Sequence, residues 1–243
     1  MPRPANRGES QLRPIEIQRD WMGAAPGRVL ISAGETVVVC TASIEASVPP
    51  WLAGKGKGWI TAEYNMLPGS TSPRKKRDRG GKVDGRTTEI QRLIGRSLRA
   101  VADLEALGEQ MIAVDCDVLQ ADGGTRTLSI TGAYVALADA IRTIKELPFA
   151  ERPPLTDSVA AVSVGVVDGR VLLDLEYVED VAAAVDMNVV MTGQGRYVEI
   201  QGTGEEATFG DDDLTHLLDF ARAGVSELAS LQRQAMGDDW PLA

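Results

Sequence analysis

Histidine and cysteine are scarce in this chain. One histidine, His216, and two cysteines, Cys40 and Cys116, occur among its 243 residues. A histidine-based metal cluster is therefore excluded, and a Ser-His-Asp triad would have to use His216, which has no nucleophile motif near it. Each cysteine lies in a strand-like run, which predicts reduced core thiols rather than a disulfide framework or a metal site. The chemistry of this chain must use carboxylates, arginines, hydroxyls or backbone groups.

Long apolar runs are absent as well. No segment is apolar over the length of a membrane span, and residues 1–6 lack the apolar core of a secretory signal. The hydrophobic content of 44% and the charged content of 25% are typical of a globular protein, and the length allows one large domain or two small ones. We therefore expect a cytoplasmic protein with no membrane partner.

Positive charge is in deficit overall, yet it is concentrated in one segment. The net charge of −10 argues against broad, nonspecific binding of nucleic acids. Residues 74–82 nevertheless contain six positive side chains, one negative side chain and no apolar one, directly after Ser72-Pro73. Such a run is either a solvated surface loop or a polyanion-binding loop. Because the rest of the chain is acidic, we favour a loop that binds a polyanion.

A glycine-rich junction at residues 122–127, Asp-Gly-Gly-Thr-Arg-Thr, lies where a strand pattern ends and a helix pattern begins. Two glycines let the backbone approach a ligand closely, and the first N–H groups of a helix form an anion site. Thr125 adds a hydroxyl, and Arg126 adds a planar guanidinium suited to phosphate. Arg86, just before another predicted helix, could also reach an anion. The residues alone fit either a phosphate site or an ordinary turn with a surface arginine.

Two acidic residues in the last third of the chain are candidates for a shared site. On a straight strand, Asp180 and Asp186 would lie about 20 Å apart, and on a continuous helix they would lie on different faces. They can share a site only if residues 181–185 fold back, and three alanines in that segment make a compact turn feasible. The acidic triplet at residues 211–213 instead predicts a cap at the start of the last helix.

Three prolines mark residues 148–157 as a connector between a first half, residues 1–147, and a second half, residues 158–243. Each half opens with a hairpin pattern and continues to a helix, as a duplicated unit would, and we expect one compact unit overall. The expected hairpins span residues 29–42, 158–177 and 187–201, the expected strands residues 59–66 and 111–120, and the expected helices residues 88–107, 128–144 and 214–231.

In chain order these segments resemble the RNase PH family of phosphate-dependent 3′-to-5′ exoribonucleases, which trim tRNA precursors. Each segment is a weak motif by itself, but the ordered set covers nearly the whole chain and is highly specific. In one departure, relatives often carry an arginine directly after the Met-Leu-Pro element, where this chain has Gly69. The segments that carry the resemblance are residues 58–64, 85–99, 115–127, 161–170, 179–180, 186–190 and 199–205.

The resemblance implies an α/β (α+β) fold with duplicated βαβ halves, whose mixed sheets are backed by helices as in domain 2 of ribosomal protein S5. It also implies release of nucleoside diphosphates from tRNA precursors in a reversible reaction, with inorganic phosphate as co-substrate and Mg²⁺ as the expected cofactor. The implied assembly is a homo-hexamer, a trimer of dimers. The matching positions are Arg86, Gly124, Thr125 and Arg126 for phosphate, Asp180 and Asp186 for catalysis and the metal, and Arg74, Arg77 and Arg79 for RNA.

Three other functions explain the sequence less well. A non-catalytic ring or scaffold subunit that only binds RNA would be expected to lose the phosphate loop or the aspartates, and this chain has both. A hydrolytic RNase would have no use for the Gly-Gly-Thr-Arg loop, and a phosphate-binding metabolic enzyme would leave residues 74–82 unexplained. We therefore predict a phosphorolytic exoribonuclease, with the scaffold subunit as the alternative.

Overall fold

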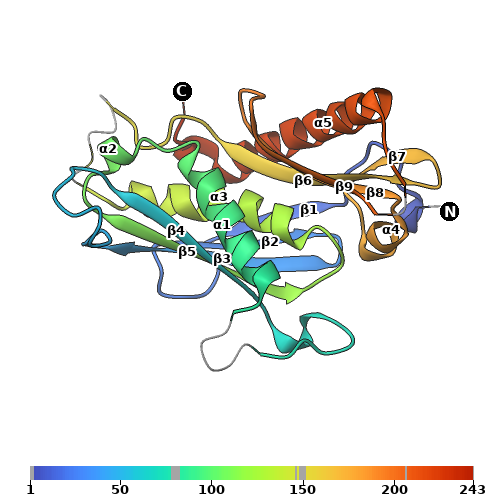
Figure 1. Ribbon diagram of the computed structural model, residues 1–243. Helices are drawn as coiled ribbons and strands as arrows, with labels where there is room; N and C mark the ends of the chain where they lie inside the picture. Colours follow the sequence, from blue (N-terminus) through green and yellow to red (C-terminus); the bar gives the residue numbers. More distant parts are fainter. Residues whose placement is uncertain (1–2, 78–82, 146, 148–151, 206, 243) are drawn as a thin grey trace.

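Two β-sheets pack against one central helix, α3 (Thr125–Arg142), as Figure 1 shows. The computed structural model describes residues 3–77, 83–145, 147, 152–205 and 207–242. Helix α3 contacts β2 and β3 of the first sheet and β6 of the second. The other helices are α1 (Gly85–Arg99), which packs on β4 and α3, the short α2 (Leu104–Leu107) and α4 (Tyr177–Ala182), and the long α5 (Asp211–Met236), which packs on β6, β7 and β8.

The first sheet has the strand order β1-β2-β3-β5-β4 and the second the order β7-β6-β8-β9. Strand β4 runs parallel to β5, so the first sheet is mixed, whereas every pairing in the second sheet is antiparallel. The strands of the first sheet are β1 (Ile15–Arg19), β2 (Gly27–Ala33), β3 (Thr36–Glu45), β4 (Trp59–Met66) and β5 (Met111–Gln120), and those of the second are β6 (Val159–Val167), β7 (Arg170–Leu173), β8 (Val185–Thr192) and β9 (Tyr197–Gly204).

The predicted fold class is confirmed: sheets backed by helices form an α/β molecule. The alternation that predicted a strand over residues 111–120 corresponds to β5, whose inward side chains are buried. The hairpin expected over residues 29–42 is β2 paired with β3, and the one over residues 187–201 is β8 paired with β9. Strand β1 is not predicted from the sequence because only two of its five residues are apolar.

The single helix expected over residues 88–107 is wrong in its bounds. Helix α1 begins at Gly85, because the Asp84 side chain accepts a 2.6 Å hydrogen bond from the Thr87 N–H, and it ends at Arg99. The N–H of Asp103 then bonds to the carbonyl of Pro154 at 2.8 Å, and the Asp103 carboxylate caps the separate helix α2. A capping aspartate interrupts an apolar pattern that would otherwise continue.

The predicted hairpin at residues 158–177 also extends too far. Strand β7 ends at Leu173, and Asp174 takes a positive φ of 56° that turns the chain out of the sheet. Reciprocal hydrogen bonds between Glu176 and Glu179 then start helix α4. The acidic triplet at residues 211–213 occupies the first turn of α5 behind the cap residue Gly210, where it suits the positive end of the helix dipole.

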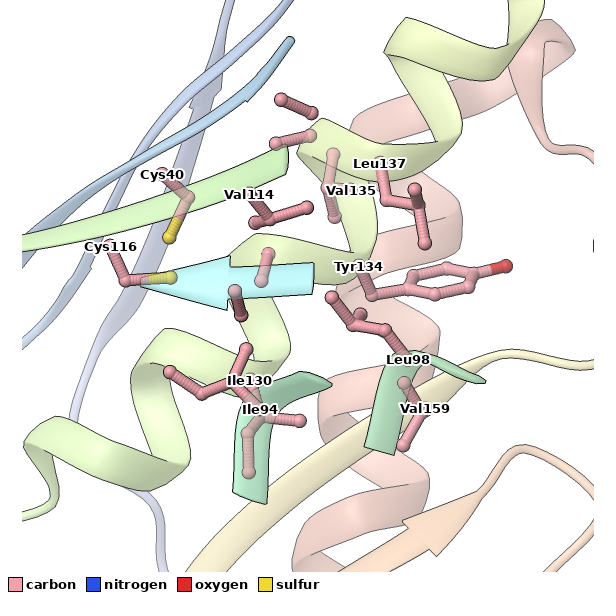
Figure 2. Packing of buried hydrophobic residues seen from close by; sticks show 14 of the residues in the cluster. Cys40, Ile94, Leu98, Val114, Cys116, Ile130, Tyr134, Val135, Leu137 and Val159 are labelled. Atoms are coloured by element: carbon pink, nitrogen blue, oxygen red, sulfur yellow. The ribbon is translucent and has the colours of Figure 1, made fainter. Parts of the chain in front are cut away.

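The main hydrophobic core surrounds α3 and contains residues from both sides of the predicted connector. Because α3 is covered on nearly all sides, almost every residue from Thr125 to Ile141 is buried. The two cysteines are free and buried at opposed positions of β3 and β5, as expected for core thiols. Figure 2 shows this packing with Ile94 and Leu98 of α1, Cys40 of β3, Val114 and Cys116 of β5, Ile130, Tyr134, Val135 and Leu137 of α3, and Val159 of β6.

Close approach between α3 and β2 requires a glycine at the start of β2. A Cβ at Gly27 would overlap the carbonyl oxygen of Ala136, a backbone atom that cannot move without shifting the helix. We expect Gly27→Ala to lower the free energy of unfolding by about 3 kcal/mol, measured by urea denaturation at fixed protein concentration. Gly69→Ala, which adds a Cβ where no atom lies within 4 Å, is the control and should have little effect. Equal stability of the two variants would contradict this packing.

None of the described helices is long and apolar enough to cross a membrane. The lone histidine, His216, lies on the exposed side of α5 and does not line the cavity described below.

Candidate active site

One cavity of about 520 Å³ receives the phosphate-loop residues and both aspartates. Arg86 comes from the first turn of α1, residues 124–126 from the start of α3, Asp180 from α4 and Asp186 from β8. Residues far apart in the sequence are therefore brought to one surface. A wider groove of about 730 Å³ runs along α5, but it contains neither the glycine loop nor an aspartate pair.

The glycines at the start of α3 are required by the backbone. Gly123 and Gly124 have φ angles of 77° and 66°, the left-handed region that favours glycine. A Cβ at Gly123 would also lie 2.5 Å from the carbonyl oxygen of Leu175. Within the described part of the chain, the N–H groups of residues 124, 125 and 126 donate to no protein acceptor. The loop therefore presents a set of free N–H donors at the positive end of a long helix, the arrangement that binds anions.

Thr125 is turned inward. Its Oγ1 lies 2.9 Å from the Tyr64 hydroxyl, and both side chains are buried. Burial raises the pKa of Tyr64, so this phenol stays neutral and can keep its hydrogen bond to Thr125. The sequence suggested the Thr125 hydroxyl as a ligand group, but its contact with Tyr64 leaves the backbone N–H as the free polar group of this residue.

The two arginines of the cavity differ in how they are held. Arg126 is mostly buried, and its Nη1 donates to Gln201 Oε1 at 2.6 Å and to Glu89 Oε1 at 3.2 Å. Arg86 is exposed and makes no ion pair within the described residues. The guanidinium of Arg126 is therefore fixed in orientation before any ligand binds, and the guanidinium of Arg86 is available to bind the ligand from another side.

The aspartate pair meets the condition set by its spacing in the sequence. Helix α4 ends at Ala182 and β8 begins at Val185, so the chain reverses between Asp180 and Asp186 and both side chains reach the cavity. Burial raises the pKa of Asp180, and the negative charge of Asp186 raises it further, against the opposing effect of Arg86 and Arg126. Two carboxylates that line the same cavity can share a proton or a cation.

The basic segment begins at the rim of the cavity. Residues 71–73 line the cavity, and Arg74 and Arg77, which follow them, are exposed. Arg79 lies outside the described residues. Gly69, at the position where relatives often carry arginine, lies in a short 3₁₀ turn, Pro68–Ser70, and a Cβ added there would meet no atom within 4 Å.

Three polar residues of the second half of the chain also line the cavity, although the sequence analysis does not name them as site residues: Ser163, Tyr177 and Asn188. Tyr177 precedes Asp180 by three positions on α4, and Asn188 follows Asp186 by two positions on β8, so each shares a face with an aspartate. That spacing is visible in the sequence once the elements are known. Ser163 gives no such signal, because its place in the cavity depends on the packing of β6 against β8.

Two family models match this chain in order. The model described as "3′ exoribonuclease family, domain 1" matches residues 11–142, and "domain 2" of the same family matches residues 157–224. The chain belongs to the 3′ exoribonuclease family.

Curated relatives of this family are similar over almost the whole length. The chain is 61% identical to Ribonuclease PH of Rhodopirellula baltica over 232 residues, which cover 93% of this chain and 94% of the relative. It is 56% identical to Ribonuclease PH of Bacillus subtilis, with 97% of each chain covered. Membership at this similarity makes the chain a phosphorolytic 3′-to-5′ exoribonuclease, an enzyme that uses inorganic phosphate as co-substrate.

Solved structures of low sequence identity share the fold. Rice (Oryza sativa) Rrp46 superposes with a TM-score of 0.78 at 18% identity, over 96% of this chain and 99% of that one. A chain of the Archaeoglobus fulgidus exosome with RNA bound to the active site also superposes with a TM-score of 0.78, at 21% identity, over 94% and 92% of the two chains. At this identity the likeness concerns the fold alone.

Proposed function

We propose that the cavity performs the phosphorolysis with Arg86, Arg126 and the N–H groups of residues 124–126 holding inorganic phosphate, and with Asp180 and Asp186 acting at the leaving 3′ oxygen of RNA. The observation that carries this assignment is the convergence of a free N–H cluster, two guanidinium groups and a carboxylate pair on one cavity. A cavity of about 520 Å³ has room for a phosphate ion and one terminal nucleotide.

Phosphorolysis requires two anions to meet, the free phosphate and the terminal phosphodiester. Their repulsion must be offset by fixed positive groups, and guanidinium forks with backbone N–H donors supply them without rearrangement. Arg126 is pre-oriented by Gln201 and Glu89, so it fixes one face of the phosphate. Arg86, with no competing partner among the described residues, neutralises the remaining charge.

The leaving 3′ oxygen must gain a proton or a cation as its bond to phosphorus breaks. Asp180 and Asp186 offer carboxylate oxygens, and the raised pKa of Asp180, caused by burial and by the charge of Asp186, reflects a repulsion that a cation would relieve. Mg²⁺ suits this all-oxygen pair, since it is held by one or two carboxylates with water and phosphate as further ligands. Bound there, it would neutralise charge on the leaving oxygen.

The RNA body is proposed to lie along Arg74 and Arg77, with Arg79 as a third contact. Arg74 and Arg77 follow the cavity rim in the chain, so a 3′ end in the cavity would leave the preceding phosphates near these two side chains. The proposed substrates are tRNA precursors and the proposed assembly is a homo-hexamer, as the resemblance of the sequence to the RNase PH family implies. The cytoplasmic location expected from the sequence stays a prediction.

To test this assignment, we would identify the released product and measure the effect of one variant, Arg86→Ala. A 3′-extended tRNA is incubated with the protein and Mg²⁺, with and without inorganic phosphate, and the released mononucleotide is identified. We expect nucleoside diphosphates only when phosphate is present, and a higher KM for phosphate in Arg86→Ala. An Arg86→Ala enzyme with an unchanged phosphate KM would remove Arg86 from the proposed site.

Salt dependence tests the RNA contacts. Each arginine that neutralises a phosphate releases a counterion, so the double change Arg74→Ala with Arg77→Ala should reduce the slope of log affinity against log salt by about 1.4. The measurement is fluorescence anisotropy of labelled RNA between low and moderate salt, without phosphate. The matched control removes two arginines of α5, Arg222 and Arg233, which do not line the cavity. An equal slope change in both double variants would point to a general effect of charge.

A further inference from the structure

A buried ion pair lies directly behind the phosphate loop and uses residues from both ends of the fold. Arg13, in the segment before β1, holds the carboxylate of Asp174 in a bidentate pair, with Nε–Oδ2 at 2.9 Å and Nη2–Oδ1 at 2.7 Å. The Arg13 N–H adds a third hydrogen bond to Oδ2 at 2.8 Å. Both residues are at most 5% exposed, so neither is available to a ligand.

The guanidinium of Arg13 also donates hydrogen bonds to the backbone of the phosphate loop. Arg13 Nη1 donates to the carbonyl of Asp122 at 2.6 Å, and Nη2 approaches the carbonyl of Gly123 at 3.4 Å. The fully buried Thr36 completes the contact: its hydroxyl donates to the Gly123 carbonyl at 2.8 Å and accepts from the Asp122 N–H at 2.9 Å. Two buried side chains therefore bind the back of the loop.

These contacts determine which way the loop faces. In a planar trans peptide the N–H points opposite to the carbonyl of the same unit. Because the Gly123 carbonyl is drawn toward Thr36 and Arg13, the N–H of Gly124 must point the other way, away from these two side chains. The positive φ angles of Gly123 and Gly124 make the loop easy to reorient, so an unsupported loop could adopt other conformations.

Asp174 is suited to hold Arg13 in this position. Burial alone would raise the pKa of Asp174, but the hydrogen bonds and charge of Arg13 outweigh it and keep the pKa below its usual value, so the carboxylate stays ionised. The residue also terminates β7 and leads into α4, which carries Asp180. The ion pair thus joins the backbone before α4 to the loop before α3.

Neighbouring arginines connect the same segment to α4. Arg3 is buried and pairs with Glu179 through Nε–Oε1 at 2.7 Å and Nη2–Oε2 at 2.9 Å, and Arg7 reaches Glu179 at 3.2 Å. Glu179 directly precedes Asp180. Residues 3–14, the N-terminal arm, therefore contact both the loop that faces phosphate and the helix that carries an aspartate.

We propose that Arg13 and Thr36 are positioning residues that hold the N–H groups of residues 124–126 in the phosphate-binding orientation, with Asp174 anchoring Arg13. They touch neither phosphate nor RNA. This inference rests on the proposed phosphate site. It predicts that weakening the support raises the KM for phosphate and leaves the KM for RNA nearly unchanged.

The test uses Arg13→Lys in the assembled, full-length enzyme. Lysine keeps the positive charge but cannot make a bidentate pair with Asp174 and reach the loop carbonyls at once. We expect the KM for phosphate to rise about tenfold, the effect of losing one or two charge-assisted hydrogen bonds, and the KM for RNA to stay within about twofold. Thr36→Val, which removes the hydroxyl and nearly keeps the shape, should raise the phosphate KM in the same way and decides the question if Arg13→Lys does not fold.

The matched control is Arg19→Lys. Arg19 also makes a bidentate pair with an aspartate, Asp139, at 2.6 and 3.0 Å, and it bonds Asp239 as well, but it does not line the cavity or contact the loop. The Arg19→Lys variant should have a lower thermal stability than the parent enzyme and the same KM for phosphate.

The outcomes separate two kinds of failure. A phosphate KM within about twofold of the parent value in the variants of Arg13 and Thr36 that fold would overturn the inference, provided that Arg126→Ala in the same assay does change it. If Arg126→Ala also leaves the phosphate KM unchanged, the phosphate site itself is misassigned, and the inference fails with it.

Discussion

Arg126→Ala is expected to lower kcat/KM for phosphorolysis by roughly 10³-fold, which corresponds to about 4 kcal/mol of transition-state stabilisation. The side chain is mostly buried and fixed by Gln201 and Glu89, so its charge acts at short range and with no reorganisation. In the proposed site, the alanine variant loses a fixed positive charge beside the two phosphate groups that react. Phosphate titrations at saturating RNA, with nucleoside diphosphate release as the readout, measure both kcat and KM.

Two comparison variants make this result interpretable. Arg126→Lys keeps a charge but loses the planar fork, so it should fall between the parent and the alanine variant. Arg233→Ala removes an exposed arginine of α5 that does not line the cavity and should behave as the parent. If Arg126→Ala reduced activity no more than Arg233→Ala does, the guanidinium would have no part in the reaction.

Asp180→Asn should lower kcat by roughly 10²- to 10⁴-fold with little change in the KM for phosphate, since it removes a group that we propose to act on the leaving oxygen. Asparagine keeps the size of the side chain and removes its charge. Single-turnover assays with 3′-extended tRNA separate this chemical step from binding. A variant with a normal kcat and a weakened phosphate KM would place Asp180 with the phosphate ligands.

The pH profile of the parent enzyme gives a second test of the role of Asp180. Burial and the charge of Asp186 raise the pKa of Asp180, so it takes up a proton at a higher pH than an ordinary aspartate. If the reaction needs the ionised form, activity is lost as the pH falls through this raised value. Glu205→Gln removes another negative charge that raises the pKa of Asp180, so the acid limb should move to lower pH while the activity at neutral pH is kept. An acid limb that does not move would show that the limb belongs to another group.

Local patterns predicted most of the fold because they reflect burial directly. The alternation over residues 111–120 matches β5, and the helical spacing after residue 128 matches α3. The misplaced boundaries have a common cause: single polar residues, Asp103 and Asp174, change the chain direction through hydrogen bonds to partners that are remote in the sequence. Apolar periodicity carries no information about such partners.

Only part of the candidate site could be predicted from the sequence. The glycine loop and its arginine could be proposed from local chemistry, and the aspartate pair needed a fold-back that its alanine-rich spacer allows. The side chains that support the loop from behind could not be predicted from the sequence. Arg13, Thr36 and Asp174 lie in three separate segments of a polar or strand-like character. Their meeting depends on how the N-terminal arm packs against β7, a tertiary contact without a sequence period.

The enclosure of α3 by two sheets has a consequence for the energetics of ligand capture. The amide protons that are hydrogen-bonded within a helix buried on nearly all sides exchange only when the whole molecule opens, so we expect the first turn of α3 to keep its shape in the absence of phosphate. The entropy of ordering that turn is therefore lost during folding and not at each catalytic cycle. Phosphate should arrive at a site that is already rigid, and its binding should leave the hydrogen-exchange protection of α3 almost as it was.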